Sequence, residues 1–326
     1  MRPLLRLAAQ HRNRDRYGDH RHRQSLPAFR DVRVNQTIRF NYGGHATFPV
    51  RYGWLPKGLN QLITTHGFSA NTQTADALGL GSKMVDSLGY WLNMTGLRPA
   101  KDDEDLEIAK LIFAHDRYFE RPGTWWFLHL ILARQEGSVW SWFFNDFSDR
   151  IFDRITAQDA FQAYARTHAQ RPPSAAMVQR DVACLLSAYA ARPGVDLVDP
   201  EDIGACPFRE LGLVARHDAV HRFERTRRPQ GLPEEVFLAA TSALQSQKGV
   251  DRLSLRELAT LRLGPGRIFC QGLEAIETTV GKIGKKRQDG VIVESAAGDR
   301  TIHVPDRPLT YWLEALYSRV DAEAAG

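Results

Sequence analysis

Two groups of polar residues in the N-terminal half have side chains suited to phosphodiester chemistry. A histidine can act as a general base, while arginine and lysine can hold a phosphate group. We therefore take His45 and Arg51 as candidate catalytic residues and Lys57 as a candidate DNA contact. The alternative is a structural turn packed against Trp54. The full group consists of Tyr42, His45, Arg51, Tyr52 and Lys57.

The second group is the run from His115 to Glu120. Asp116 and Glu120 could share a divalent cation such as Mg²⁺ if folding brings them together, because metal-bound carboxylates commonly support phosphodiester cleavage. The other interpretation, which we favour, is a surface loop beside a buried, hydrogen-bonded His129. The metal requirement is left open. The sequence contains no P-loop and no H-E-x-x-H or G-x-S-x-G motif, so it predicts no nucleotide cofactor site.

The C-terminal part has the pattern of a helix-turn-helix. Ser254 and Glu257 have the spacing of a capping box at a helix start. A turn at Leu263-Gly264 precedes Pro265, which suits the first position of a second helix. We expect one face of this second helix to be buried and the other exposed. The expected buried face contains Phe269, Leu273, Ile276, Val280 and Ile283, and the expected exposed face contains Arg267, Gln271, Glu274 and Thr278.

Two short β-rich runs, Val291–Ser295 and Arg300–Val304, follow this helix and predict a hairpin, or wing. A winged helix-turn-helix places its second helix in the major groove of DNA. The alternative is a winged helix used for dimerisation or packing. The candidate base contacts are Arg267 and Gln271, and the candidate phosphate contacts are Lys285, Lys286, Arg287 and Arg300.

A second helix-turn-helix is predicted nearer the N-terminus, where a short helix near Thr74–Leu78 precedes a longer one. In this unit Lys83 and Ser87 would contact DNA, on the face opposite the apolar stripe. No convincing wing follows, and a coincidental helix pair is the alternative. Between the two units, residues 104–191 are predicted to be helical and rich in Trp and Phe. We interpret these aromatics as core, with stacking on unpaired bases as the alternative.

The expected fold class is therefore mostly α with small β wings. We divide the 326-residue chain into a basic disordered arm (1–33), an N-terminal helical domain (34–195) and a C-terminal winged-helix domain (196–326). The arm holds nine arginines and three aspartates, so it carries more positive charge than the whole chain, whose net charge is +5. It could grip phosphates, or it could be an upstream extension from a misassigned start codon.

The location follows from what the sequence contains. Three widely spaced cysteines without a C-x-x-C pair favour free thiols in a reducing compartment. No apolar run reaches the ~20 residues needed to span a membrane, and no export signal is apparent. We expect a cytoplasmic, nucleoid-associated protein whose partner is double-stranded DNA.

Several motifs also resemble a known family, the SspB-type DNA-nicking proteins of the bacterial Ssp phosphorothioation system. The resemblance covers roughly residues 37–304. It rests on segments that occur in the same order in that family: 44–48 (GHATF), 51–58 (RYGWLPKG), 80–85 (LGSKMV), 126–129 (WFLH), 207–213 (PFRELGL) and 263–266 (LGPG).

The resemblance implies sequence-directed DNA nicking in phosphorothioate modification and phage defence. Its implied partners are a cysteine desulfurase and an ATP-dependent sulfur-transfer enzyme. It assigns no catalytic residue. Two other interpretations stay open: a non-catalytic DNA-binding subunit or repressor that recruits the sulfur-transfer enzyme, and a protein–protein scaffold.

Overall fold

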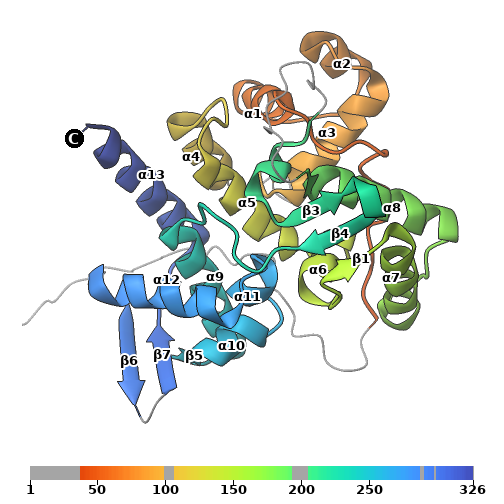
Figure 1. The fold of residues 1–326 in the computed structure, drawn as a ribbon. Helices are drawn as coiled ribbons and strands as arrows, with labels where there is room; N and C mark the ends of the chain where they lie inside the picture. The colour runs from red at the N-terminus through yellow and green to blue at the C-terminus, as the bar shows by residue number, and fades with distance from the viewer. Residues whose placement is uncertain (1–36, 99–105, 193–204, 287–289, 297–298, 326) are drawn as a thin grey trace, which may run out of the picture. The chain divides into compact units, whose positions relative to one another are not determined.

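The computed structural model describes residues 37–98, 106–192, 205–286, 290–296 and 299–325. Most of these residues are helical and the strands form two small sheets (Figure 1), so the expected class of a mostly α fold with small β elements is confirmed. The arm 1–33 and Arg287 lie outside the described residues, and the division at residue 195 stays a prediction. The first eight helices are α1 (Trp54–Thr64), α2 (Thr72–Leu78), α3 (Ser82–Met94), α4 (Glu107–His115), α5 (Pro122–Ala133), α6 (Val139–Asn145), α7 (Arg154–His168) and α8 (Ala175–Tyr189).

Helix α5 is buried on every side, from Thr124 to Ala133. A helix that is apolar all round belongs in the interior, and α5 packs against α6 and α9 (Glu234–Lys248). The aromatic residues of this region are packed against one another in the core, which confirms that interpretation over base stacking. The buried set is Trp125, Trp126, Trp140, Trp142, Phe143, Phe144, Phe147 and Phe152.

Helix α3 buries two faces, where the sequence predicted one. Ser87 is fully buried, and its hydroxyl donates to the Phe48 carbonyl at 3.4 Å. Tyr90 is also buried, and its hydroxyl accepts from the Trp140 indole at 2.7 Å. The expected exposed face of α3 is therefore wrong at Ser87, because partners distant in sequence cover it. Lys83, at the start of the helix, is exposed.

The first sheet has the strand order β1-β4-β3-β2. Its strands are short: β1 (Ile151–Phe152), β2 (Ala190–Ala191), β3 (Val214–His217) and β4 (Arg222–Arg225). The β2–β3 pair is parallel and the other pairs are antiparallel. Two 3-10 turns, η1 (Pro207–Leu211) and η2 (Asp218–Val220), flank β3. This sheet brings the end of β4 next to β1, which follows α6 in the chain.

The C-terminal segment contains a second, three-stranded sheet of order β5-β7-β6. The hairpin pairs residues 292–296 with 299–303 in register, and it lies beside α12 (Figure 1). Gly284 permits the close approach of α12 to β6, because a Cβ added there would lie 3.3 Å from Val293. The elements after α9 are β5 (Leu253–Ser254), α10 (Leu255–Thr260), α11 (Pro265–Ile268), α12 (Leu273–Lys286), β6 (Ile292–Ala296), β7 (Asp299–His303) and α13 (Leu309–Ala325).

The capping box of Ser254 and Glu257 is confirmed, but the helix expected from Pro265 onward is two helices. Helix α11 ends at Ile268, and Cys270 adopts a left-handed conformation with φ 51°. The Gln271 N–H then donates to the Gly266 carbonyl at 2.9 Å. This is a Schellman-type ending. Because cysteine stands where glycine is usual, the sequence carried little signal for the break.

Helix α13 packs against α9 and α4. The three cysteines are free and buried, as their spacing suggested. Within the described ranges, no helix combines the length and apolar character that a membrane crossing requires.

Candidate nucleic-acid interface

Helix α12 exposes a face of mixed charge. Ala275, Ile276, Val280 and Ile283 are buried, which agrees with most of the expected stripe, whereas Leu273 is 50% exposed. Phe269 is buried, but in the turn before the helix. The open face therefore starts at the first residue of α12. It carries Glu274, Glu277, Thr278, Lys282 and Lys285.

The candidate phosphate contacts differ in how far their charge is compensated. Lys286 forms an ion pair with Glu234 at 2.9 Å, and Arg300 lies 3.9 Å from the Glu277 carboxylate. Lys285 is exposed and forms no ion pair within the described part of the chain. Among the candidate phosphate contacts that the structure describes, Lys285 is therefore the one without an ion-pair partner.

The two candidate base-reading residues lie before α12. Arg267 is half-buried on α11, where its Nε donates to the Thr260 carbonyl at 3.2 Å. Gln271 is only 8% exposed, so its expected position on an open helix face is wrong. The Schellman-type ending of α11 turns the chain there and buries the glutamine. Both residues instead line an open groove.

This groove has a volume of about 420 Å³. Among its ten lining residues are three arginines and no carboxylate. Arg225 and Arg227 were missed from the sequence because they lie some forty residues before α11 in the chain. The run Arg225-Thr226-Arg227-Arg228 between β4 and α9 was the available signal. The lining residues are Arg225, Arg227, Ala259, Thr260, Gly266, Arg267, Cys270, Gln271, Gly272 and Leu273.

The two walls of the groove are joined by hydrogen bonds. The Gly272 N–H donates to the Arg227 carbonyl at 2.9 Å. Arg225 is buried, and its guanidinium donates to the carbonyl oxygens of Phe144 and Phe147 at the end of α6. It also lies 3.6 Å from the Cys270 sulfur. Arg225 therefore anchors the wall, whereas Arg227 and Arg267 face the groove with donors to spare.

His45, a candidate catalytic residue, is 1% exposed and bonded at both ring nitrogens. Nδ1 accepts from the Thr47 N–H at 3.0 Å, which places the proton of a neutral ring on Nε2. Nε2 then donates to Asp181 at 3.0 Å, and Asp181 also accepts from the Gly43 N–H at 2.9 Å. A general base needs hydrogen-bond reach to its substrate. This geometry favours a structural link between the loop and α8, and catalysis by His45 stays a prediction.

The neighbouring cations are held by local contacts. Arg51 lies over the rings of Phe48 and Trp54, with its guanidinium carbon 5.7 and 5.6 Å from their centroids. Lys57 is exposed and donates to the Leu78 carbonyl at 2.9 Å. The packing against Trp54 agrees with the structural alternative for this group. The Tyr52 hydroxyl donates to Glu210 of η1.

Asp116 is buried and holds the turn that precedes α5. It accepts from the N–H groups of Glu120 and Arg121 at 2.8 and 3.2 Å, and from the Thr124 hydroxyl at 2.6 Å. Burial raises its pKa above the ordinary value. The same threonine hydroxyl lies 2.9 Å from that of Tyr317 on α13.

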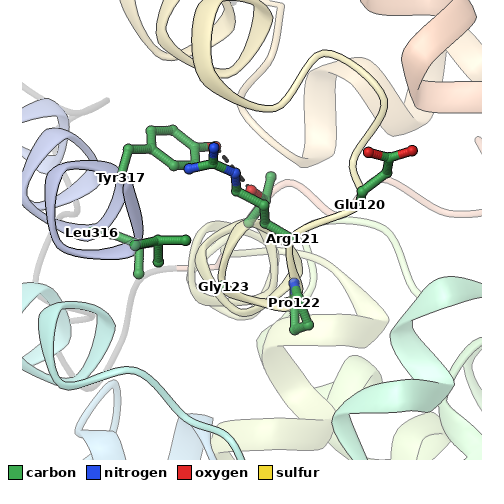
Figure 2. A pocket seen from close by; sticks show the side chains of 8 residues that line it. Glu120, Arg121, Pro122, Gly123, Leu316 and Tyr317 are labelled. Atoms are coloured by element: carbon green, nitrogen blue, oxygen red, sulfur yellow. Dashed lines mark hydrogen bonds between the residues drawn. The ribbon is translucent and has the colours of Figure 1, made fainter. Parts of the chain in front are cut away.

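Beside this turn lies a small pocket of about 190 Å³, lined by the start of α5 and by α13 (Figure 2). Glu120 is exposed, and its carboxylate lies apart from Tyr317 in Figure 2. In the described ranges, no group of three or more His, Cys, Asp or Glu side chains is placed to hold a metal ion. Asp116 already accepts three hydrogen bonds, which favours a structural role, and a cation shared with Glu120 stays a prediction.

His129 is buried, as expected, and joins three elements. Its Nε2 donates to the Ile268 carbonyl of α11 at 2.9 Å, so Nδ1 of the neutral ring accepts from the Tyr189 hydroxyl of α8 at 2.8 Å. Burial lowers the pKa of this histidine to about 4. The neutral ring thus ties α11, and with it the groove, to the helical core.

The chain was compared with protein families, curated proteins and solved structures. The family model described as "Protein of unknown function (DUF4007)" matches residues 42–318. Two solved structures, described as "SspB crystal structure" and "Magnesium ion-bound SspB crystal structure", share the fold with a TM-score of 0.72 each. Each is 22% identical in sequence, and the match covers 86% of this chain and 88% of the other. A search of curated proteins found no match.

Proposed function

The chain belongs to the DUF4007 family, and we propose that it binds double-stranded DNA through a winged helix-turn-helix formed by α9, β5, α10, α12, β6 and β7. The observation that carries this proposal is the topology: a three-stranded sheet of order β5-β7-β6 in which the hairpin β6–β7 follows α12. In such units the last helix enters the major groove and the wing meets phosphates. Lys285 and Arg300 are then the phosphate contacts, while Lys286 contributes less.

We further propose that this DNA binding serves nicking in phosphorothioate modification and phage defence. The support is the fold shared with SspB structures, together with the motif resemblance described above. The same resemblance supplies a cysteine desulfurase and an ATP-dependent sulfur-transfer enzyme as partners. Binding to double-stranded DNA would place the protein at the nucleoid. One related structure is described as magnesium-bound, which makes Mg²⁺ the divalent cation to test.

A second candidate is a non-catalytic DNA-binding subunit or repressor that recruits the sulfur-transfer enzyme. The positions of His45 and Asp116 favour it, because both side chains are buried and bonded within the protein. In this case the chain would bind DNA and leave cleavage to a partner.

Two measurements on the pure, full-length protein test these functions. Fluorescence anisotropy with a labelled duplex across a salt series should give an affinity that falls with log salt concentration. Conversion of supercoiled plasmid to open circle, with and without Mg²⁺, separates the two candidates. Duplex binding without nicking would support the recruiting subunit, and absence of duplex binding would contradict both and favour a protein–protein scaffold.

A further inference from the structure

The groove before α12 has the composition of an anion site. Its lining includes three guanidinium groups and no carboxylate, and its volume of about 420 Å³ lies in the range of small-ligand sites. Gly272 and Leu273 stand at the start of the 14-residue helix α12, whose N-terminus carries partial positive charge. Every fixed charge lining the groove therefore has the same sign.

Two of the three arginines have donors available. The exposed Arg227 side chain forms no hydrogen bond or ion pair with any residue that the structure describes. Arg267 uses Nε for the Thr260 carbonyl, and its terminal nitrogens likewise have no partner in the described ranges. A planar guanidinium with two free terminal nitrogens suits the oxygens of a phosphate. The Arg225 guanidinium already donates to the carbonyl oxygens of Phe144 and Phe147, so Arg225 holds the wall of the groove in place.

Gln271 provides a second, independent observation that points to a ligand. Its side chain is more than nine-tenths buried, yet its Oε1 has no hydrogen-bond partner among the described residues. A buried polar atom without a partner costs about 1–3 kcal/mol. The two ends of a carboxamide exchange by rotation about its last bond, so the amide could turn its NH₂ group toward a bound oxygen acceptor.

We propose that this groove binds one phosphate group, held by Arg227 and Arg267 with Gln271 beside it. The identity of the ligand rests on the proposed DNA-binding function: the phosphate group is then a phosphodiester of the DNA backbone. The site would fix the position of the DNA backbone at the start of α12, at the opposite end of this helix from Lys285. Of its residues, Arg227 lies before α9 and outside the helix-turn-helix, whereas Arg267 and Gln271 lie between α10 and α12.

The neighbouring residue supplies a matched control. Arg228 is paired with Glu274 on the first turn of α12, and it does not line the groove. Its charge is therefore already compensated. Arg227→Gln and Arg228→Gln each remove one positive charge from adjacent positions on an exposed segment. Because neither side chain is buried, both variants should fold, which matching thermal unfolding curves would verify.

The test compares wild type, Arg227→Gln, Arg267→Gln and Arg228→Gln. Anisotropy with duplex DNA over a salt series should show the salt slope reduced by about 0.9 in each groove variant, the value for one lost phosphate contact, and nearly unchanged in Arg228→Gln. In parallel, ³¹P line broadening of inorganic phosphate measures occupancy of the groove without DNA. Broadening should occur with wild type and Arg228→Gln and be lost in the two groove variants.

The outcomes separate the two proposals. Wild-type duplex binding with equal slopes in all four proteins would overturn the groove site while leaving DNA binding intact. Phosphate broadening that depends on Arg227 and Arg267, without any duplex binding, would overturn the DNA-binding function and retain a site for free phosphate. Absence of both signals in wild type would overturn both.

Discussion

The histidine that joins α5, α8 and α11 should make the protein less stable in acid. His129 is neutral in the fold because protonation would place a charge in the core, and its pKa is lowered from the ordinary 6.5 to about 4. The unfolded chain thus binds a proton between these values that the folded protein does not. The contribution of the neutral His129 ring to the free energy of unfolding is fully present above about pH 7 and decreases as the pH falls. The total loss is about 3 kcal/mol, of which about 2 kcal/mol is gone at pH 5.

The contribution of His129 can be isolated with His129→Gln, which does not titrate and can still donate to the Ile268 carbonyl. Urea unfolding of both proteins, followed by tryptophan fluorescence, gives their difference in unfolding free energy at each pH. We expect wild type to be more stable at pH 7.5 and this advantage to shrink by about 2 kcal/mol at pH 5. A difference that stays constant across this range would refute the assignment of the acid sensitivity to His129.

Three further changes test the packing around Gly44, the charges at the end of α12 and the turn before α5. Gly44→Ala should lower the unfolding free energy by about 1–3 kcal/mol, since the new Cβ would lie 2.5 Å from a buried tyrosine ring. Gly67→Ala, whose Cβ would meet nothing within 4 Å, is the matched control in thermal unfolding. Lys285→Ala should reduce the salt slope of duplex binding by about 0.9. Lys286→Ala should reduce it less, because that charge is already paired; equal reductions would contradict this ranking. Asp116→Ala should cost about 1–3 kcal/mol of stability through loss of the hydrogen bonds that hold the turn before α5, yet leave any nicking activity of the folded fraction intact. Abolished activity in a stably folded variant would return Asp116 to the catalytic candidates.

Sequence patterns predicted the segments whose structure depends on residues close together in the chain. The capping box at Ser254 and the β6–β7 hairpin depend on residues only a few positions apart. The same is true of the buried Ile276, Val280 and Ile283, whose spacing is that of a helix face. In these segments periodicity and capping agree with the tertiary structure.

Long-range contacts decided what the sequence could not predict. Ser87 has the polarity of a surface residue, but a backbone carbonyl some forty residues away covers it. The break before α12 depends on a cysteine in a left-handed conformation, which is seldom adopted by residues other than glycine and asparagine. Arg227 reaches the groove because the sheet β1-β4-β3-β2 brings the end of β4 beside α11. No short window of sequence contains these relations.

The segment between α10 and α11, which is the turn of the proposed helix-turn-helix, is attached to the helical core. The Leu263 N–H, between α10 and α11, donates to the Asn145 side chain at 2.8 Å, and the Leu263 carbonyl accepts from Arg134 at 3.3 Å. Leu263 itself has φ 63°, a strained value for leucine that the surrounding contacts must maintain. With His129 bonded to the next helix, residues of α5 and α6 fix both ends of α11. The groove walls are therefore positioned by buried hydrogen bonds from the N-terminal half. If the proposed DNA binding is correct, the helical core as well as the proposed helix-turn-helix would set the orientation of the bound DNA.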